Sequence, residues 1–342
     1  MNDSPPSKTV HKAVGRAVGR PLLDNELAIR PAAPHQSNRL YDIRVEGEHL
    51  IAKEYLRADL PDAARHEYEA LRFVESLHLA PVPVFFDPNV GPVVVYRHME
   101  GEMWDRRIPS ASELRALAEM WLRFHCLSAD GLWVATGQAR PWSEIEARLH
   151  APLVAYGLWA ERRSSQVRDA ARLCLEALDR SLAGAARLVP IDTPRLCFCR
   201  SDARFANVIA RPDGRLGLVD WEDSGLRDPA REIADLLTHP NQEDLLDWDA
   251  WQPFLSVYTQ SRQDDPGFER RLQGCLGVFP VFWLGLLLAD GMRRIADGNF
   301  DGWLINEMEP NARLRRYLAR AQAWPDPDPT AALLRLGDMR FF

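Results

Sequence analysis

The sequence predicts an α+β protein in two parts, with a small antiparallel sheet near the N-terminus and a larger helical region after it. Three observations support this prediction. Segments with alternating apolar and polar residues recur between Leu40 and Arg97. From residue 112 onward the apolar spacing becomes mostly helical. One β-like stretch, from Leu196 to Trp221, interrupts the helices and contains the densest group of residues able to perform chemistry.

These patterns divide the chain into three parts. Residues 1–20 contain four basic side chains and no long apolar stretch, so we expect a flexible N-terminal arm rather than a signal peptide. Residues 21–99 are expected to form an N-lobe, and residues 100–342 a helical C-lobe. The longest apolar run, from Cys275 to Ala289, is interrupted by Pro280 and predicts a buried helix.

Composition limits the possible partners. Of the 342 residues, 46% are hydrophobic and 27% are charged, which is typical of a globular protein. The formal net charge is −7, so we do not expect a nucleic acid as partner; cationic or metal-bridged partners fit better. We expect no membrane partner either, because the longest apolar run is short and interrupted by Pro280. The five cysteines are scattered and odd in number, which argues against a disulfide framework and predicts a cytoplasmic location.

The N-lobe pattern indicates two pairs of strands and one helix. Residues 40–55, LYDIRVEGEHLIAKEY, alternate around a Glu-Gly turn, which predicts an antiparallel hairpin. A helix is expected to begin at Asp62 and to end near Leu77. Two further strands are expected on either side of the turn at residues 87–92.

Lysine is rare in this chain, with only three among 42 basic residues. Lys53, in the second strand of the hairpin, is the one lysine inside the expected fold. It indicates a confined site that needs a compact charge, unless it protects a sheet edge from aggregation. Glu67 lies on the apolar face of the following helix; the alternative is a surface acid paired with Arg65 or Arg72.

The stretch from Leu196 to Trp221 brings together three residues with complementary chemistry. Asn207 and Asp220 supply hard oxygen ligands, which suit Mg²⁺. Asp202, one loop upstream, is placed to accept a proton from an attacking hydroxyl. Taken singly, each of the three is also a common turn or cap residue, and that interpretation stays open here.

The pairing in the hairpin between these residues is predictable. With a two-residue Asp-Gly turn at residues 213–214, Val208 pairs with Val219 and Asn207 pairs with Asp220. The turn would then bring the two expected metal ligands to one end of the hairpin.

The string of motifs has a known counterpart. A D-x-x-x-x-N loop from Asp202 to Asn207 precedes the hairpin, V-D-W-E follows at residues 219–222, and D-P-A at residues 228–230. This arrangement resembles the aminoglycoside phosphotransferase and choline kinase family, relatives of the protein kinases. The resemblance extends over roughly the whole chain from Leu22. It implies a bilobal protein-kinase-like fold, ATP and Mg²⁺ as cofactors, and transfer of the γ-phosphoryl group to a hydroxyl of a small molecule.

The resemblance also implies a role for each matching residue. Asp202 would be the catalytic base, and Asn207 and Asp220 would hold Mg²⁺. Lys53 would contact the α and β phosphates with Glu67 as its partner. The hinge that meets adenine through backbone groups would consist of Arg97, His98 and Met99.

Two positions depart from the family pattern. Arg200 and Ser201 stand where the family usually has His-Gly before its base, so we expect the loop to be held differently. The turn expected to cover the phosphates, at Ser37 and Asn38, contains no glycine.

Two other functions remain as alternatives. The Arg-Ser departure would fit a non-catalytic nucleotide-binding protein. A kinase for protein hydroxyls is disfavoured, because the short step from Asp220 to the helix start at Asp228 leaves little room for an activation segment.

The acceptor is not determined by these motifs; an aminoglycoside, an amino alcohol or a sugar-like molecule would use the same machinery. The acidic run EDLLDWDAW, residues 243–251, suits a cationic acceptor, or is a solvated helix face anchored by its tryptophans. Cys197 and Cys199 are expected to be buried thiols, since a metal site would need two further ligands. His125 is expected to be a packed core histidine.

Overall fold

The computed structural model describes residues 7–22, 27–29, 38–56, 62–105, 107–128, 142–188, 196–305, 307–326 and 328–342. The chain divides into two compact units. The first unit comprises Met1–Asp105, Glu119–Gln138 and Cys197–Leu226. The second comprises Arg106–Ala118, Ala139–Leu196 and Arg227–Phe342. The first unit thus joins the N-terminal sheet to the β segment that carries the chemical motifs, while the lobe boundary at residue 99 stays a prediction.

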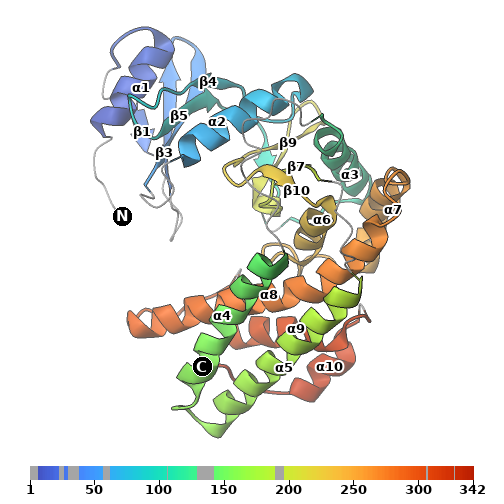
Figure 1. Ribbon diagram of the computed structural model, residues 1–342. Helices are drawn as coiled ribbons and strands as arrows, with labels where there is room; N and C mark the ends of the chain where they lie inside the picture. Colours follow the sequence, from blue (N-terminus) through green and yellow to red (C-terminus); the bar gives the residue numbers. More distant parts are fainter. Residues whose placement is uncertain are drawn as a thin grey trace. The chain divides into compact units, whose positions relative to one another are not determined.

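The first unit contains an antiparallel sheet of five strands in the order β1-β2-β3-β5-β4. Figure 1 shows this sheet in blue and teal beside helix α1 (Lys8–Val18). Its strands are β1 (Leu27–Ile29), β2 (Asn38–Val45), β3 (Glu48–Tyr55), β4 (Pro83–Phe85) and β5 (Val93–Arg97). β2 and β3 form the predicted hairpin, and its two turn residues, Glu46 and Gly47, both have positive φ. Because β3 is the central strand, Lys53 pairs with Leu40 and Val94, and its interpretation as an edge lysine is wrong.

The expectation of a flexible arm is wrong for the described part of residues 1–20. Helix α1 (Lys8–Val18) begins after Ser7, whose Oγ accepts a hydrogen bond from the Val10 backbone N–H, and it ends at Gly19. Its apolar side packs on the sheet and is fully buried at Val10, Ala13 and Val14. These small apolar residues recur at a spacing of three and four, so they form one face of a helix that can pack on the sheet. The basic residues between them do not prevent this packing.

Helix α2 (Ala63–Val74), followed by a 3₁₀ turn at Glu75–Leu77, matches the predicted helix. Its buried residues are Ala64, Glu67, Ala70, Leu71 and Val74. Glu67 is therefore the acid on the buried face, and the alternative of a surface acid is wrong.

A second antiparallel sheet, β6-β8-β9, contains the hairpin of the chemical motifs. Its strands are β6 (Glu102–Met103), β8 (Val208–Ala210) and β9 (Leu216–Leu218). Val208 pairs with Leu218, so the predicted register is wrong by one residue. Asn207 accordingly accepts a hydrogen bond from the backbone N–H of Val219, at 3.0 Å, and is not opposite Asp220.

The length of the turn causes this shift. The Arg211 carbonyl accepts from the Gly214 N–H at 3.0 Å, and the Arg211 N–H donates to the Arg215 carbonyl at 2.9 Å. The loop therefore has three residues, with Pro212 at the position of a type I turn that favours proline and Gly214 in the left-handed region at φ 79°.

The other elements are mostly helices. They are α3 (Ala111–His125), α4 (Trp142–Ala160), α5 (Ser165–Leu188), α6 (Pro229–Thr238), α7 (Gln252–Gln260), α8 (Phe268–Ala296), α9 (Pro310–Ala323) and α10 (Thr330–Leu336), with the short strands β7 (Cys197–Cys199) and β10 (Gly225–Arg227). In the second unit α4, α5, α8, α9 and α10 enclose one apolar core. Helix α8 contains the predicted apolar helix. By length and hydropathy it could span a membrane, but 61% of its most apolar window is buried within the protein, as in a core helix.

Candidate active site

Lys53 is the centre of an ion-pair cluster in the first unit. Its Nζ lies 2.7 Å from Glu67 Oε2, 2.5 Å from Asp220 Oδ1 and 3.1 Å from Glu222 Oε2. The side chains of Lys53 and Glu67 are 5% and 1% exposed, whereas those of Asp220 and Glu222 are 22% and 23% exposed. The cluster is thus sealed at Glu67 and open at Asp220 and Glu222.

The sealed end is held by two side chains of β3 and by one backbone group of the loop after β9. Besides Lys53, Glu67 accepts hydrogen bonds from the Tyr55 hydroxyl and, at 3.3 Å, from the Trp221 backbone N–H. Burial opposes the charge of Lys53, but Asp220 and Glu67 outweigh it and raise the pKa of the lysine well above its usual range. Lys53 therefore stays a cation and its ammonium group is fixed at one point.

The pKa values of the two carboxylates at the open end are shifted in opposite directions. Burial alone would raise the pKa of Asp220, yet Lys53 and Arg204 hold it below its ordinary value. For Glu222, burial and the neighbouring charges of Asp220 and Glu67 prevail over Lys53 and raise the pKa above its ordinary value. Glu222 also accepts a 2.7 Å hydrogen bond from Asn38 Nδ2.

The predicted loop of Asp202 and Asn207 joins this cluster through one arginine. Asn207 Nδ2 donates to Asp202 Oδ2 at 2.6 Å. Arg204 Nε lies 3.1 Å from the same Asp202 oxygen, and Arg204 Nη2 lies 3.3 Å from Asp220 Oδ2. The expected base and the expected metal ligand are thus connected by a single guanidinium group.

Arg200 shows how the loop is held without the family's usual histidine. Its side chain is fully buried, and it donates to the backbone carbonyls of Val219, at 3.1 Å, and Asp202. The next residue, Ser201, has φ 70°, in the left-handed region where glycine is free of strain. The Arg200 guanidinium therefore holds the loop through two backbone carbonyls. Ser201 has a backbone conformation that glycine adopts without strain, and glycine is the residue expected at this position.

The remaining predicted nucleotide contacts occupy defined positions, although their roles stay predictions. Arg97 ends β5, and the His98 N–H donates to the His49 carbonyl at 2.9 Å, while the two histidine rings stack. Met99 lies against Gly217 of β9. Asn38 is the first residue of β2 rather than part of a turn, and Ser37 lies outside the described residues.

The carboxylates around Lys53 are the kind of donor set that suits a hard divalent cation, and Asp220 and Glu222 are its accessible members. Oxygen atoms of Glu67, Asp220 and Glu222 lie within 4.8 Å of one another. Carboxylate oxygens are the ligands that Mg²⁺ prefers, and Asp202 adds a fourth acid nearby. Four carboxylates, Glu67, Asp202, Asp220 and Glu222, thus lie beside three cations, Lys53, Arg200 and Arg204. Sequence reasoning passed over Glu222, although the V-D-W-E motif places it two residues after Asp220.

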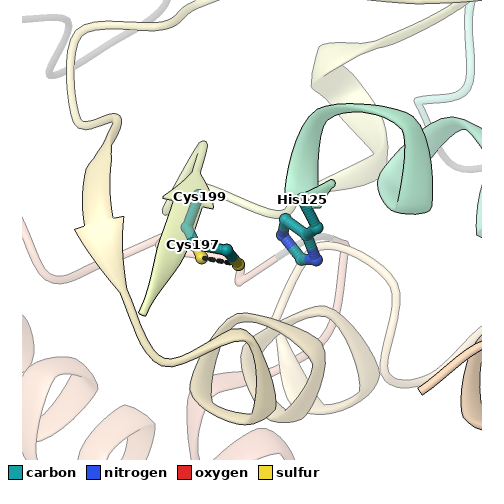
Figure 2. Close-up of side chains that lie close together, drawn as sticks. All are labelled: His125, Cys197 and Cys199. Atoms are coloured by element: carbon teal, nitrogen blue, oxygen red, sulfur yellow. Dashed lines mark hydrogen bonds between the residues drawn. The ribbon is translucent and has the colours of Figure 1, made fainter. Parts of the chain in front are cut away.

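A second cluster in the first unit consists of His125, Cys197 and Cys199 (Figure 2). All three are buried, their ligand atoms lie within 4.8 Å of one another, and the two sulfurs are 3.7 Å apart. Among the described residues no fourth such ligand joins them, whereas structural zinc sites have four. The cysteines are free thiols, as expected, and His125 packs edge-on against Phe124.

The acidic run at residues 243–251 lies in the second unit and has two different parts. Glu243 is fully buried and paired with the buried Arg313, so it belongs to the interior. Asp247, Trp248 and Asp249 instead line a cavity of 730 Å³. Its other lining residues include Arg315, Arg316 and Arg320. The cavity therefore presents both signs of charge.

Comparison with known families identifies the fold to which this site belongs. A family model described as the phosphotransferase enzyme family matches residues 28–271, which is more than half of the chain. The chain belongs to this family. The match includes Lys53, Glu67, Asp202 and the hairpin that follows, so the resemblance predicted from the motifs is confirmed.

Solved structures of phosphotransferases share the fold at low sequence identity. The choline kinase LicA from Streptococcus pneumoniae is 17% identical, with 87% of this chain and 95% of that chain covered and a TM-score of 0.57. The macrolide 2'-phosphotransferase MphH from Brachybacterium faecium is 16% identical, with 85% and 97% covered and a TM-score of 0.57. The spectinomycin phosphotransferase APH(9)-Ia, in complex with ADP and spectinomycin, is 11% identical, with 90% and 92% covered and a TM-score of 0.61. Comparison with curated proteins finds no match. The chain has the α+β, kinase-like fold predicted for it.

Proposed function

We propose that this phosphotransferase uses ATP and Mg²⁺ to move the γ-phosphoryl group of ATP to a hydroxyl of a small molecule in the cytoplasm. The observation that carries the proposal is the position of Lys53. It lies on the central strand, is sealed against Glu67 on one side, and faces two half-open carboxylates on the other. A fixed ammonium group beside carboxylates suits a phosphate chain that arrives with a divalent cation.

The residues of this chain divide the chemistry among them. Asp220, Asn207 and Glu222 would hold Mg²⁺, which when bound neutralises phosphate charge. Lys53 would exchange its contact with Asp220 for phosphate oxygens while Glu67 continues to hold it. Preorganised positive charge of this kind is the main catalytic contribution in phosphoryl transfer.

Asp202 would act on the acceptor. Its carboxylate would accept the proton of the acceptor hydroxyl as the hydroxyl oxygen forms a bond to the γ-phosphorus and the bond from that phosphorus to the β–γ bridging oxygen breaks. The hydrogen bond from Asn207 Nδ2 and the buried Arg200 fix the loop that orients this carboxylate. ADP and the phosphorylated acceptor are the products.

The test is a panel of hydroxyl acceptors, covering aminoglycosides, amino alcohols and sugars, incubated with protein, ATP and Mg²⁺. We expect at least one acceptor to be phosphorylated. Asp202→Asn should lower kcat about 10³-fold, the range for loss of a general base, and leave ATP affinity nearly unchanged. Asp213→Asn, on the exposed turn of the same hairpin, is the matched control and should retain activity.

Two outcomes would overturn the proposal. If the protein binds ATP but phosphorylates no acceptor in an extended panel, the non-catalytic alternative replaces it. If Asp202→Asn keeps full activity, the assignment of the base is wrong. The panel also distinguishes cationic from neutral acceptors.

A further inference from the structure

Arg204 connects the loop of Asp202 to the cluster around Lys53 and has no role in the proposal above. Its guanidinium group contacts Asp202 Oδ2 at 3.1 Å and Asp220 Oδ2 at 3.3 Å. These are the carboxylates expected to accept the proton and to hold the metal. A cation in this position is next to the place where the transferring group must lie.

The backbone of Arg204 is fixed, while its side chain remains accessible. The Arg204 N–H donates to the Asp202 carbonyl at 2.9 Å, and the Arg204 carbonyl accepts from the Asn207 N–H at 3.1 Å. The side chain is nevertheless 42% exposed, against 0% for Arg200 and 5% for Lys53. Of the three cations in the site, Arg204 is the one that an incoming ligand reaches first.

Neither carboxylate depends on Arg204 alone. Asp202 keeps its hydrogen bond from Asn207. Asp220 is paired with Lys53 in the nucleotide-free protein and would gain the divalent cation when Lys53 turns to the phosphates. The guanidinium can therefore move to a new partner without leaving a buried carboxylate unpaired. A divalent cation arriving at Asp220 would repel it, and phosphate oxygens, which match its planar donor geometry, would attract it.

We propose that Arg204 is a further catalytic residue, which contacts the γ-phosphoryl oxygens during transfer. The inference rests on the proposed function. In the nucleotide-free protein Arg204 neutralises Asp202 and Asp220, and on ATP binding it turns to the γ-phosphoryl group. It donates hydrogen bonds to the equatorial oxygens as the bond to the acceptor oxygen forms and the bond to the β–γ bridging oxygen breaks, and it exchanges no proton.

The test compares nucleotides that differ only in the γ-phosphate. Binding of Mg·ADP and of a non-hydrolysable Mg·ATP analogue is measured by calorimetry for the wild type, Arg204→Gln and Arg204→Lys. We expect Arg204→Gln to lose about tenfold or more in affinity for the ATP analogue, as for a lost charge-assisted hydrogen bond, and to bind ADP as before. Its kcat should fall about 100-fold, and Arg204→Lys should recover part of both losses.

Arg215→Gln, an exposed arginine on the same hairpin, is the matched control and should change neither quantity. Equal losses for ADP and the ATP analogue, or no loss for either, would overturn the assignment, since a merely structural residue does not distinguish the two nucleotides. Thermal unfolding of each variant shows that it is folded. A wild type that binds neither nucleotide refutes the proposed function itself, whereas a wild type that binds and turns over ATP beside an indifferent Arg204→Gln refutes only this inference.

Discussion

Two charged clusters in this protein are built in opposite ways. In the first unit one cation, Lys53, faces three carboxylates, and two of these are 22% and 23% exposed. In the second unit Glu243 and Arg313 form an ion pair in which both side chains are fully buried, while Asp244, Arg316 and Arg320 lie beside it and are 8%, 34% and 21% exposed. The Glu243–Arg313 pair therefore lies wholly in the interior. Asp220 and Glu222 instead reach the surface, where a divalent cation can contact them, and a fully buried ion pair offers no such access.

The same substitution in the two clusters should therefore have different effects. Glu243→Gln leaves the buried Arg313 with Asp244 as its remaining carboxylate, at 3.2 Å. We expect the free energy of unfolding to fall by about 3 kcal/mol, as when a buried pair loses one partner. Urea unfolding measures this, with the exposed Asp247→Asn of the same run as control. A loss below about 0.5 kcal/mol, typical of surface changes, would contradict the comparison.

Glu222→Gln in the open cluster should leave the free energy of unfolding at pH 7 unchanged or slightly higher. The carboxylate is disfavoured there, because burial and the charges of Asp220 and Glu67 raise its pKa. Urea unfolding under the same conditions, without Mg²⁺, makes the measurement. A loss equal to that of Glu243→Gln would show that the two clusters are alike.

Lowering the pH should change the contributions of Asp220 and Glu222 to the free energy of unfolding in opposite directions. The pKa of Asp220 is lowered from 3.8, so its ion pair contributes stability above that pH and loses it as the pH falls below. Glu222 changes the stability in the opposite direction. Its pKa in the folded protein is raised above 4.5, so its protonation removes the free-energy cost of holding a charged carboxylate there. On acidification the wild type should lose stability relative to Asp220→Asn and gain it relative to Glu222→Gln. Unfolding in metal-free buffer from pH 6 to pH 2 checks both directions, because the loss at Asp220 begins near pH 4 and continues as the pH falls toward its lowered folded pKa.

The smallest effect concerns the loop before Asp202. Ser201→Gly removes a side chain from a residue at φ 70°, so the left-handed conformation is no longer strained. We expect a gain of up to about 1 kcal/mol in the free energy of unfolding, reduced by the greater freedom of glycine in the unfolded chain. A loss of stability would show that the serine side chain, rather than the backbone shape, holds the loop.

Local patterns predicted much of this structure. The hairpin at residues 40–55 and the buried face with Glu67 follow from alternation and helical spacing, which neighbouring residues determine. The register around residues 213–214 did not follow, because Pro212 lengthens the turn to three residues and a one-residue change alters every pair. Helix α1 was missed because its apolar side consists of three small residues between basic ones.

The predicted site residues were found by residue type and spacing. The residues that were missed are defined by which side chains they contact in the folded protein. Lys53 drew attention by its rarity and Asp202 by its motif. Arg204 lies inside that motif, but arginine is common in this chain, so its residue type gave no signal. Its contacts with both Asp202 and Asp220 are seen only in the three-dimensional structure. Which carboxylates contact one lysine depends on how β3, α2 and the hairpin pack, and no local pattern encodes that.

Calorimetric titration of the wild type and of Lys53→Met with Mg·ADP tests the central claim most directly, because ADP carries the phosphates that Lys53 is expected to hold. We expect one binding site in the wild type and an affinity lower by about tenfold or more in a folded Lys53→Met. A wild type that does not bind Mg·ADP, or a Lys53→Met that binds it equally well, would show that Lys53 is not part of a nucleotide site.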